Sequence, residues 1–339
     1  MKKLFLSFVA VLIGSMTANA ATYNKALLQH NDEVTPFDAN KVQDAVDAAV
    51  DGDIIYLSEG TFKSFNVTKM ITVRGVGETS VVNGNVTINI PNTPTLTNPV
   101  LETLAVNGSV TVSSAISNLL FRQCKISSSL SLTKTLSGGK IEKCQIGSVS
   151  FSGTIRDLII DRCKITSSFT LSSSIQGMTV FNTNIYNLSA NDVTNNTNFI
   201  NCNLCFSNTD YFSGTIINSI VYHDSSYSKT INSTDFINTL IKSSYYDTSN
   251  WLTYYLSLGS SCFTQDCYFV STSSLDTDPS NLQSNGYLGT DGKVVGIYGG
   301  DNPYDKNMLV AKVPKVTSSD LEVDLEQKKL NVTLTVSPQ

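Results

Sequence analysis

The chain has 339 residues, of which 41% are hydrophobic and 15% are charged, and its formal net charge is −5 at pH 7. This length is ample for a continuous hydrophobic core, whereas binding to nucleic acid phosphates calls for a basic excess that this chain lacks. Nucleic acid is therefore not expected as a partner.

The first twenty residues have the layout of a cleaved signal peptide. Two lysines precede an apolar run over residues 4–13 and a small-residue ending at residues 18–20, which predicts export with cleavage after Ala20. No later apolar run approaches the roughly 20 residues that a membrane-spanning helix needs, so no transmembrane segment is expected. The mature protein is predicted to be secreted or located at the cell surface.

A polar lead over residues 21–37 is followed by a predicted helix at about residues 40–51. Asn40 is expected to cap this helix, and Val42, Val46 and Ala49 share one of its faces,. A buried strand is predicted over residues 54–57, directly after the helix.

A six-residue motif recurs between about residues 119 and 269. Each copy reads apolar, any residue, polar, small, any residue, apolar, as in the FRQCKI that begins at Phe121. The small residues of the successive copies are Cys124, Cys144, Cys163, Thr183, Cys202, Ser219 and Thr239. Their separations of 17 to 20 residues identify the chain as a repeat protein,.

A second pattern follows the early copies of the motif. Ser-rich sequence leads to two apolar residues two positions apart, as at Leu130 and Leu132, which is typical of a strand with one buried face. Two strand signals in each repeat, joined by turns too short for a helix, predict an all-β parallel β-helix over residues 38–300. A leucine-rich repeat is disfavoured because its fixed Leu and Asn spacing is missing. Residues 91–99, with three prolines, are predicted to loop out of the ladder.

The order of helix, buried strand and GTF turn over residues 40–62 resembles the opening of right-handed parallel β-helix proteins of the pectate-lyase-like superfamily. The resemblance extends by pattern to about residue 269 and implies a right-handed coil with a helix covering its first turn. The signatures of polygalacturonases, pectate lyases and pectin methylesterases are missing, and His30 and His223 are the only histidines. No catalytic residue, cofactor or metal is therefore predicted.

Most of the seven cysteines are predicted to be buried free thiols. Cys124, Cys144 and Cys163 occupy one position of successive coils and would fill the interior as small hydrophobic side chains. Their parallel side chains suit the disulfide torsion poorly. The pairing of Cys205, Cys262 and Cys267 stays open.

Two groups of residues are candidates for ligand binding. Lys125 and Lys164 are expected at one outward position two coils apart, with Arg162 beside them, where they could bind an acidic glycan or simply belong to a solvated face of alternating charge. The second group would form an aromatic platform for sugar rings, or would fill the space under a long loop. It comprises Tyr245, Tyr246, Asp247, Trp251, Tyr254 and Tyr255.

A hydroxyl ladder at Ser131, Ser150, Thr170 and Ser189 would suit an ice-binding face. This interpretation is disfavoured because flat, regular Thr-x-Thr rows are not evident in the sequence.

The tail over residues 301–339 is rich in charge and ends in a predicted β-hairpin at about residues 321–336,. A solenoid needs its last coil covered, so the tail is predicted to be a C-terminal cap. The alternative is a module for a cell surface or a protein partner.

The favoured function is an exported, non-catalytic β-helix protein that binds polysaccharide or acts as an adhesin-like surface module. One alternative is a polysaccharide lyase or glycoside hydrolase with an atypical site on the basic stripe. The other is a structural spacer without a ligand.

Overall fold

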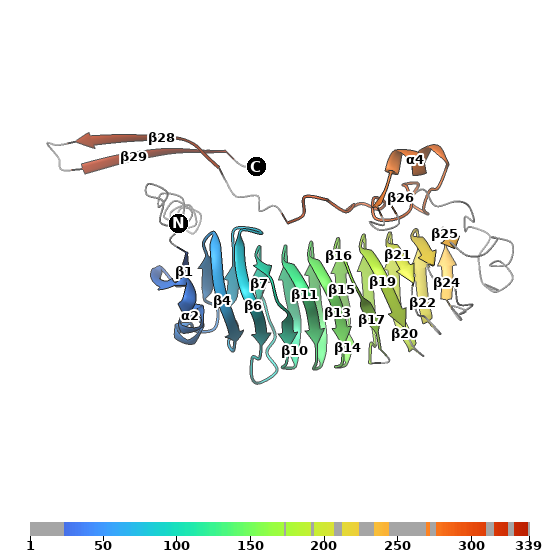
Figure 1. The fold of residues 1–339 in the computed structure, drawn as a ribbon, viewed down its shortest axis with the longest axis horizontal. Helices are drawn as coiled ribbons and strands as arrows, with labels where there is room; N and C mark the ends of the chain where they lie inside the picture. The colour runs from blue at the N-terminus through green and yellow to red at the C-terminus, as the bar shows by residue number, and fades with distance from the viewer. Residues whose placement is uncertain are drawn as a thin grey trace.

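The computed structural model describes residues 24–172, 174–190, 193–206, 212–223, 234–243, 269–271, 276–309, 315–324 and 329–337. The predicted signal peptide, the aromatic candidates at 245–255, Cys262 and Cys267 lie outside these residues. Figure 1 shows a long rod built from stacked coils, with a shorter segment running above it.

Two long sheets form the rod. Sheet A contains β1 (Lys25–His30), β2 (Glu33–Asp38), β3 (Ile54–Leu57), β5 (Thr72–Arg74), β7 (Leu101–Glu102), β10 (Ile116–Arg122), β12 (Leu136–Glu142), β14 (Ile155–Arg156), β15 (Leu158–Asp161), β18 (Met178–Phe181), β20 (Val193–Ile200), β22 (Phe212–Ile217) and β24 (Thr234–Ile237). Sheet B contains β4 (Gly60–Val67), β6 (Ser80–Ile88), β8 (Ala105–Val106), β9 (Val110–Val112), β11 (Lys125–Leu132), β13 (Gln145–Phe151), β16 (Lys164–Ile165), β17 (Phe169–Leu171), β19 (Asn184–Ala190), β21 (Asn203–Phe206), β23 (Ile220–His223) and β25 (Leu240–Ser243).

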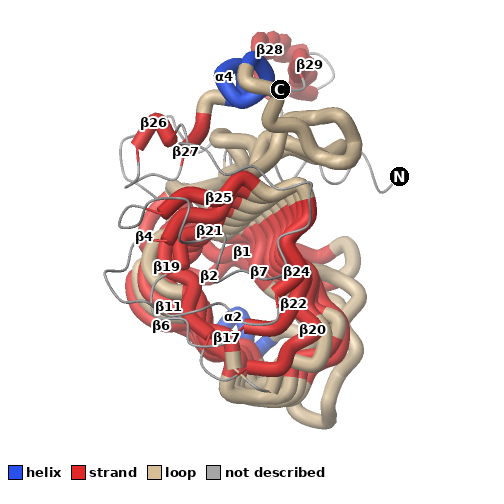
Figure 2. The backbone as a smooth tube through the Cα atoms, turned by 90° about the vertical axis from the view of Figure 1, so that its right-hand side faces the viewer, coloured by secondary structure: helices blue, strands red, loops and turns tan. Residues whose placement is uncertain are grey.

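The chain alternates between the two sheets, and from β3 onward each strand pairs in parallel with the strand one coil away. This confirms the predicted all-β parallel solenoid. Seen end-on, the two sheets enclose a narrow interior (Figure 2). The interior is filled by every second residue of the strands, in one hydrophobic cluster that extends from Ala26 to Phe236,.

The polar residue of the repeated motif makes the corner between the sheets. In each copy it has a left-handed backbone conformation, with φ between 43° and 54°. These corner residues are Gln123, Lys143, Arg162, Asn182, Asn201, Asn218 and Asn238. Asn tolerates this conformation better than most residues with a side chain, and it occupies the last four corners.

The small residue that follows each corner is a hydrogen-bond acceptor as well as a space filler. The backbone N–H of Cys124 donates to Sγ of Cys144 in the next coil, and the N–H of Cys163 donates to Oγ1 of Thr183 at 3.1 Å. Cys, Ser and Thr all supply such an acceptor, whereas Ala would not. The ladder therefore selects for a small polar side chain, which the prediction of a purely hydrophobic role overlooked.

The thiols of Cys124, Cys144, Cys163 and Cys202 are free and buried, as predicted. Burial raises the pKa of Cys202 to about 12 and raises that of Cys144 well above its ordinary value,. Cys205 is also buried and packs with Tyr222.

The N-terminal end of the solenoid is covered by a helix and a hairpin. The lead forms the antiparallel pair β1–β2, and β1 extends sheet A by pairing with β3. Helix α2 (Val42–Ala48) buries Val42, Ala45 and Val46. The expected cap at Asn40 is wrong, because the 3₁₀ turn η2 (Ala39–Lys41) includes this residue and no side chain caps α2.

Other sequence expectations about local structure are also tested. The predicted strand over 54–57 coincides with β3. Residues 91–99 contain no strand, and they contact the ladder through an isolated bridge from Thr95 and a hydrogen bond from Thr72 to the carbonyl of Pro99. Among the described helices, none combines the length and apolar character needed to cross a membrane.

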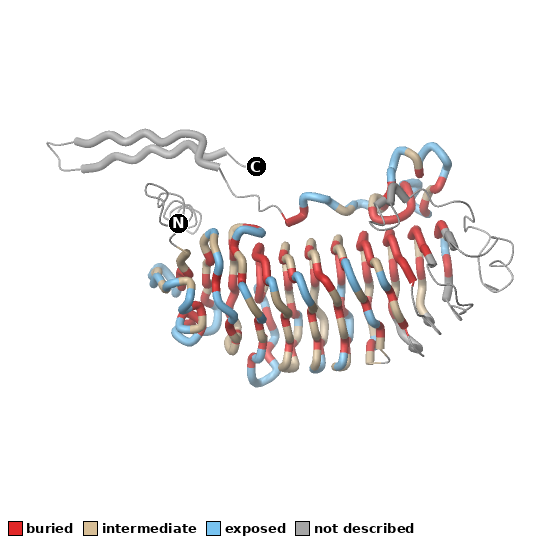
Figure 3. Tube along the Cα trace, in the orientation of Figure 1, coloured by how far each residue is buried: buried red, intermediate tan, exposed pale blue. Residues whose placement is uncertain are grey.

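Residues 276–309 lie within or next to the range predicted as coils, but they form a different structure. The short strands β26 (Phe269–Ser271) and β27 (Asp276–Thr277) pair with each other, and helix α4 (Pro279–Ser284) follows. The chain then runs back over the solenoid (Figures 1 and 3). We call residues 287–309 the strap.

Strands β28 (Lys315–Asp324) and β29 (Lys329–Ser337) pair antiparallel, which confirms the predicted hairpin in the tail. Among the described strands they pair only with each other. The role of the hairpin as a cap for the last coil stays a prediction.

Candidate functional site

The strap is attached to the corner residues of the later coils. Asn218 accepts a hydrogen bond from the backbone N–H of Thr290 at 2.9 Å, and Asn182 donates to the carbonyls of Ile297 and Gly299 at 3.1 and 2.7 Å. Farther along the strap, Gln123 donates to the carbonyl of Met308 at 3.1 Å. These partners come from progressively earlier coils, so the strap runs along the edge where the sheets meet.

Two glycines explain why this approach requires a Gly-rich sequence. A Cβ atom on Gly296 would lie 2.4 Å from the side chain of Asn203, and one on Gly300 would lie 2.4 Å from that of Asn201. Both glycines also have positive φ, which disfavours residues with a side chain. Gly296 and Gly300 are thus required by the contact of the strap with the corner.

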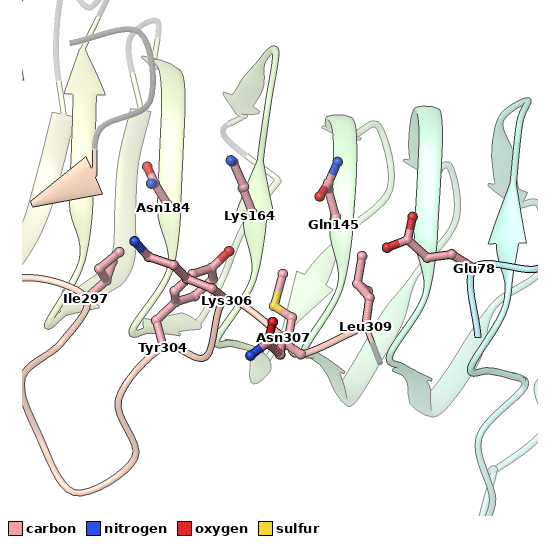
Figure 4. A pocket seen from close by; sticks show the side chains of 10 residues that line it. Glu78, Gln145, Lys164, Asn184, Ile297, Tyr304, Lys306, Asn307 and Leu309 are labelled. Carbon is pink, nitrogen blue, oxygen red and sulfur yellow. The ribbon is translucent and has the colours of Figure 1, made fainter. Parts of the chain in front are cut away.

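A cavity of about 360 Å³ lies between the strap and the start of the sheet B strands. In Figure 4 the sheet B residues Gln145, Lys164 and Asn184 lie in one row, and the labelled strap residues lie in a second row below them. Its lining residues are Glu78, Gln145, Lys164, Asn184, Ile297, Tyr304, Lys306, Asn307, Met308 and Leu309. The cavity combines two ammonium groups and three amides with apolar walls from the strap.

The predicted row of Lys125 and Lys164 is confirmed by the strand register. Lys125 pairs with Gln145, and Gln145 pairs with Lys164, on successive strands of sheet B. Gln145 and Lys164 line the cavity, whereas Lys125 forms an ion pair at 2.6 Å with Glu78 at its rim. Lys164 also lies over the ring of Tyr186, with Nζ 5.6 Å from the ring centre,.

Arg162 does not line the cavity. It occupies a corner and forms an ion pair with the neighbouring Asp161 at 2.7 Å. Its expected role in glycan binding together with Lys125 and Lys164 stays a prediction. The aromatic candidates Tyr245, Tyr246, Asp247, Trp251, Tyr254 and Tyr255 fall outside the described residues.

The outward surface of sheet A carries a ladder of ion pairs. Arg74 and Arg122 both contact Glu102, at 2.5 and 3.3 Å, and Arg122 also contacts Glu142 at 2.6 Å. Lys140 extends the ladder to Glu142 and Asp161. This arrangement supports the interpretation of these charges as a structural face, since each carboxylate is matched by cations from its own or a neighbouring coil.

The pKa of Glu142 reflects this ladder. Partial burial by itself would raise the pKa, but the hydrogen bonds from Lys140 and Arg122 and their positive charges outweigh it, so the pKa lies below the ordinary value,. The pKa values of Arg122 and Lys140 are raised: burial opposes their charge, and contacts with the carboxylates overcome it.

The outward surface of sheet B carries a different pattern. The sequence predicted four of its positions, namely Ser131, Ser150, Thr170 and Ser189. Two residues flank the buried centre of each strand and point outward, and they make two rows along the solenoid. The first row is Ser64, Asn85, Ser109, Ser129, Ser148, Ser168 and Asn187. The second row is Asn66, Thr87, Thr111, Ser131, Ser150, Thr170 and Ser189. We call these two rows the hydroxyl face.

No protein family model, curated protein or solved structure matches this chain. The parallel β-solenoid is therefore established by the register of the chain's own strands. In the described part of the chain, no group of three or more His, Cys, Asp and Glu side chains is placed to hold a metal ion.

Proposed function

We propose that this protein is an exported, non-catalytic member of the pectate-lyase-like superfamily that binds acidic polysaccharide and acts as an adhesin-like module at the cell surface. The observation that carries the proposal is the cavity between the strap and sheet B. Parallel coils behind an N-terminal helix support the superfamily and the right-handed coil that it implies. The layout of residues 1–20 supports export.

The chemistry of the cavity favours an acidic sugar unit. Its charged side chains are those of Glu78, Lys164 and Lys306, and the charge of Glu78 is offset by Lys125. The two lysines supply ammonium groups that can contact a carboxylate or sulfate group, while Gln145, Asn184 and Asn307 supply amides that can bond to sugar hydroxyls,. A volume of about 360 Å³ is at the lower end of the range typical of small-molecule sites, roughly 300–1,000 Å³.

The strap contributes to the specificity of this site. Ile297, Met308 and Leu309 are buried and hold one wall in place, while Lys306 on the same segment supplies charge. A polymer whose end or side branch enters the cavity would thus contact both the strap and the coils. Binding should depend on the strap staying attached.

Affinity electrophoresis of the full chain tests the proposal. Gels contain one polysaccharide each, either acidic (polygalacturonate, alginate) or neutral, and are stained afterwards for intact polymer. We expect retardation in an acidic gel without a cleared zone, and a loss of roughly tenfold or more in affinity for the double variant Lys164→Gln, Lys306→Gln, which removes two charge-assisted contacts. The matched control is Lys63→Gln, Lys134→Gln, which makes the same charge change at exposed lysines outside the cavity.

Unchanged migration in every acidic gel would remove the acidic-glycan assignment. A cleared zone would instead indicate a lyase or hydrolase. Equal loss in the two double variants would show that net charge, rather than the cavity, governs retardation.

A further inference from the structure

The hydroxyl face is unusual in composition for so large a surface. All fourteen positions in its two rows are Ser, Thr or Asn, and none of them is buried. The residues between them, such as Val110, Leu130 and Val149, are buried in the core. On each strand an outward polar residue therefore alternates with an inward apolar one. Burial accounts for the apolar residue alone and does not account for the uniform choice of Ser, Thr and Asn outside.

The side chains of the hydroxyl face are partly aligned by bonds between coils. Ser109 and Ser129 share a hydrogen bond at 2.9 Å, as do Ser131 and Ser150 at 3.2 Å and Thr170 and Ser189 at 3.3 Å. Every hydroxyl can donate one bond and accept two. The array thus keeps hydrogen-bonding capacity toward solvent while its side chains are held in register by the strands.

The composition excludes several classes of partner for this face. It has no positive charge for nucleic acid phosphates or anionic lipid. It also lacks the aromatic, Met and Arg side chains that are enriched in protein interfaces, where Ser is depleted. Ice is disfavoured because the rows mix Ser, Thr and Asn, and because register shifts interrupt β4 and β11, so the groups do not repeat as a flat lattice.

We propose that the hydroxyl face binds extended chains of an uncharged polysaccharide laid along the solenoid axis. Sugar hydroxyls are uncharged donors and acceptors, as are the groups in both rows. Seven strands spaced by about 4.8 Å give a track roughly 30 Å long, which suits a polymer. No residue of the hydroxyl face lines the cavity, so this inference and the proposed function concern two different sites. They share only the general class of ligand, a polysaccharide.

The lack of aromatic rings in both rows leads to a specific expectation about ligand length. Without stacking, binding depends on hydrogen bonds whose net contributions are each small. Many must form at once, as they can when successive sugars of one chain occupy successive coils. Polymers should therefore bind, whereas fragments of two or three sugars should neither bind measurably nor compete.

Co-sedimentation of the full chain with insoluble cellulose, chitin and mannan tests this inference. The test variant Thr111→Val, Ser131→Ala, Ser150→Ala removes three adjacent hydroxyls of the second row and should weaken binding roughly tenfold to hundredfold. The matched control Ser137→Ala, Thr179→Val, Thr215→Val removes three half-buried hydroxyls from sheet A and should stay within about twofold of the unmodified chain. Circular dichroism verifies that both variants are folded.

The cavity variant Lys164→Gln, Lys306→Gln separates this inference from the proposed function. It should retain binding to the neutral polymer while losing the acidic one. The inference is overturned if none of the three polymers retains the full chain, if the sheet B and sheet A variants bind equally well, or if the cavity variant loses neutral binding. Adsorption to ice without adsorption to any polymer would overturn it as well.

Discussion

The two outward faces of the solenoid come from the same coils but differ in chemistry. On sheet A, Arg74, Glu102, Arg122 and Glu142 alternate in sign along one row, and each bonds to its neighbour. On sheet B, the two rows of the hydroxyl face carry no charge at all. The outward charges of sheet A therefore join one coil to the next, whereas the hydroxyl face joins its coils through uncharged groups.

The alternation of sign on sheet A also specifies register. Arg122 lies opposite Glu102 on one side and Glu142 on the other. A slip by one whole coil would place Arg74 opposite Arg122 without a carboxylate between them, which is destabilising in a sheet. The native register does pair Glu142 with Asp161, and Lys140 contacts both of these carboxylates. Beyond Asp161 the same row becomes apolar, with Phe181, Ile200, Ile217 and Ile237, and there the corner asparagines bound to the strap provide specific contacts instead.

Breaking the ladder at its most buried member should have the largest effect. Glu102 is only 8% exposed, and Glu102→Leu leaves Arg74 without the carboxylate that it contacts. We expect the free energy of unfolding to fall by about 3 kcal/mol, because the variant loses two charge-assisted hydrogen bonds from the partly exposed Arg74 and Arg122,. Urea unfolding measures the change, and a loss below about 0.5 kcal/mol would contradict a stabilising ladder.

The corner between the sheets should respond somewhat less strongly. Asn182→Ala removes two buried hydrogen bonds to the strap and places Ala at a positive φ, for an expected loss of about 2 kcal/mol. Protease digestion should then cleave the strap sooner than it does in the unmodified chain. Asn118→Ala is a suitable control, since Asn118 also has a positive φ but is exposed and makes none of the hydrogen bonds that join corner residues to the strap. Equal cleavage in both variants would contradict attachment of the strap through Asn182.

The charged face should make stability depend on acid. The pKa of Glu142 is lowered in the folded protein, so its contribution is complete above the ordinary carboxyl pKa and is lost as the pH falls through the folded value. Glu142→Gln should lower stability by about 1 kcal/mol near pH 7, after allowance for solvent screening, and should flatten the decline toward about pH 3. If the free energy of unfolding of the two proteins declined in parallel with falling pH, Glu142 would not be the group responsible for the acid dependence.

Removing hydroxyls from sheet B should have the smallest effect on stability. The variant Thr111→Val, Ser131→Ala, Ser150→Ala deletes no buried group. Its free energy of unfolding should therefore differ from that of the unmodified chain by less than about 0.5 kcal/mol for each substituted residue. Thermal unfolding beside the sheet A variant Glu102→Leu makes the comparison direct. A loss as large as that of Glu102→Leu would mean that the hydroxyl face is structural and is not kept for a ligand.

Local patterns in the sequence predicted much of this architecture. The spacing of small residues from Cys124 onward and the apolar pairs such as Leu130 and Leu132 predicted parallel coils, because a coil that stacks on its copy must repeat its inward residues. The same spacing placed Lys125 and Lys164 in one row. It did not predict the left-handed corner at Arg162, because a backbone conformation of this kind is not evident from a repeat period.

The cavity and the full hydroxyl face were not evident before the chain was folded. Tyr304 and Lys306 reach Lys164 only because the strap runs back over coils that precede it by more than a hundred residues. Four hydroxyl positions were noted in the sequence, but the long loop at 91–99 and the bulges hid their continuation to Thr111, Thr87 and Asn66.

The sequence by itself determined the repeat, the inward and outward alternation and the acceptor that each coil offers the preceding coil, since these depend on neighbouring residues and a constant period. Only the tertiary structure decided where the strap lies, which lysines share a cavity and how far each outward row extends. Such contacts join residues that no local period relates, and they form because glycines in the strap let its backbone meet the asparagines at the corners.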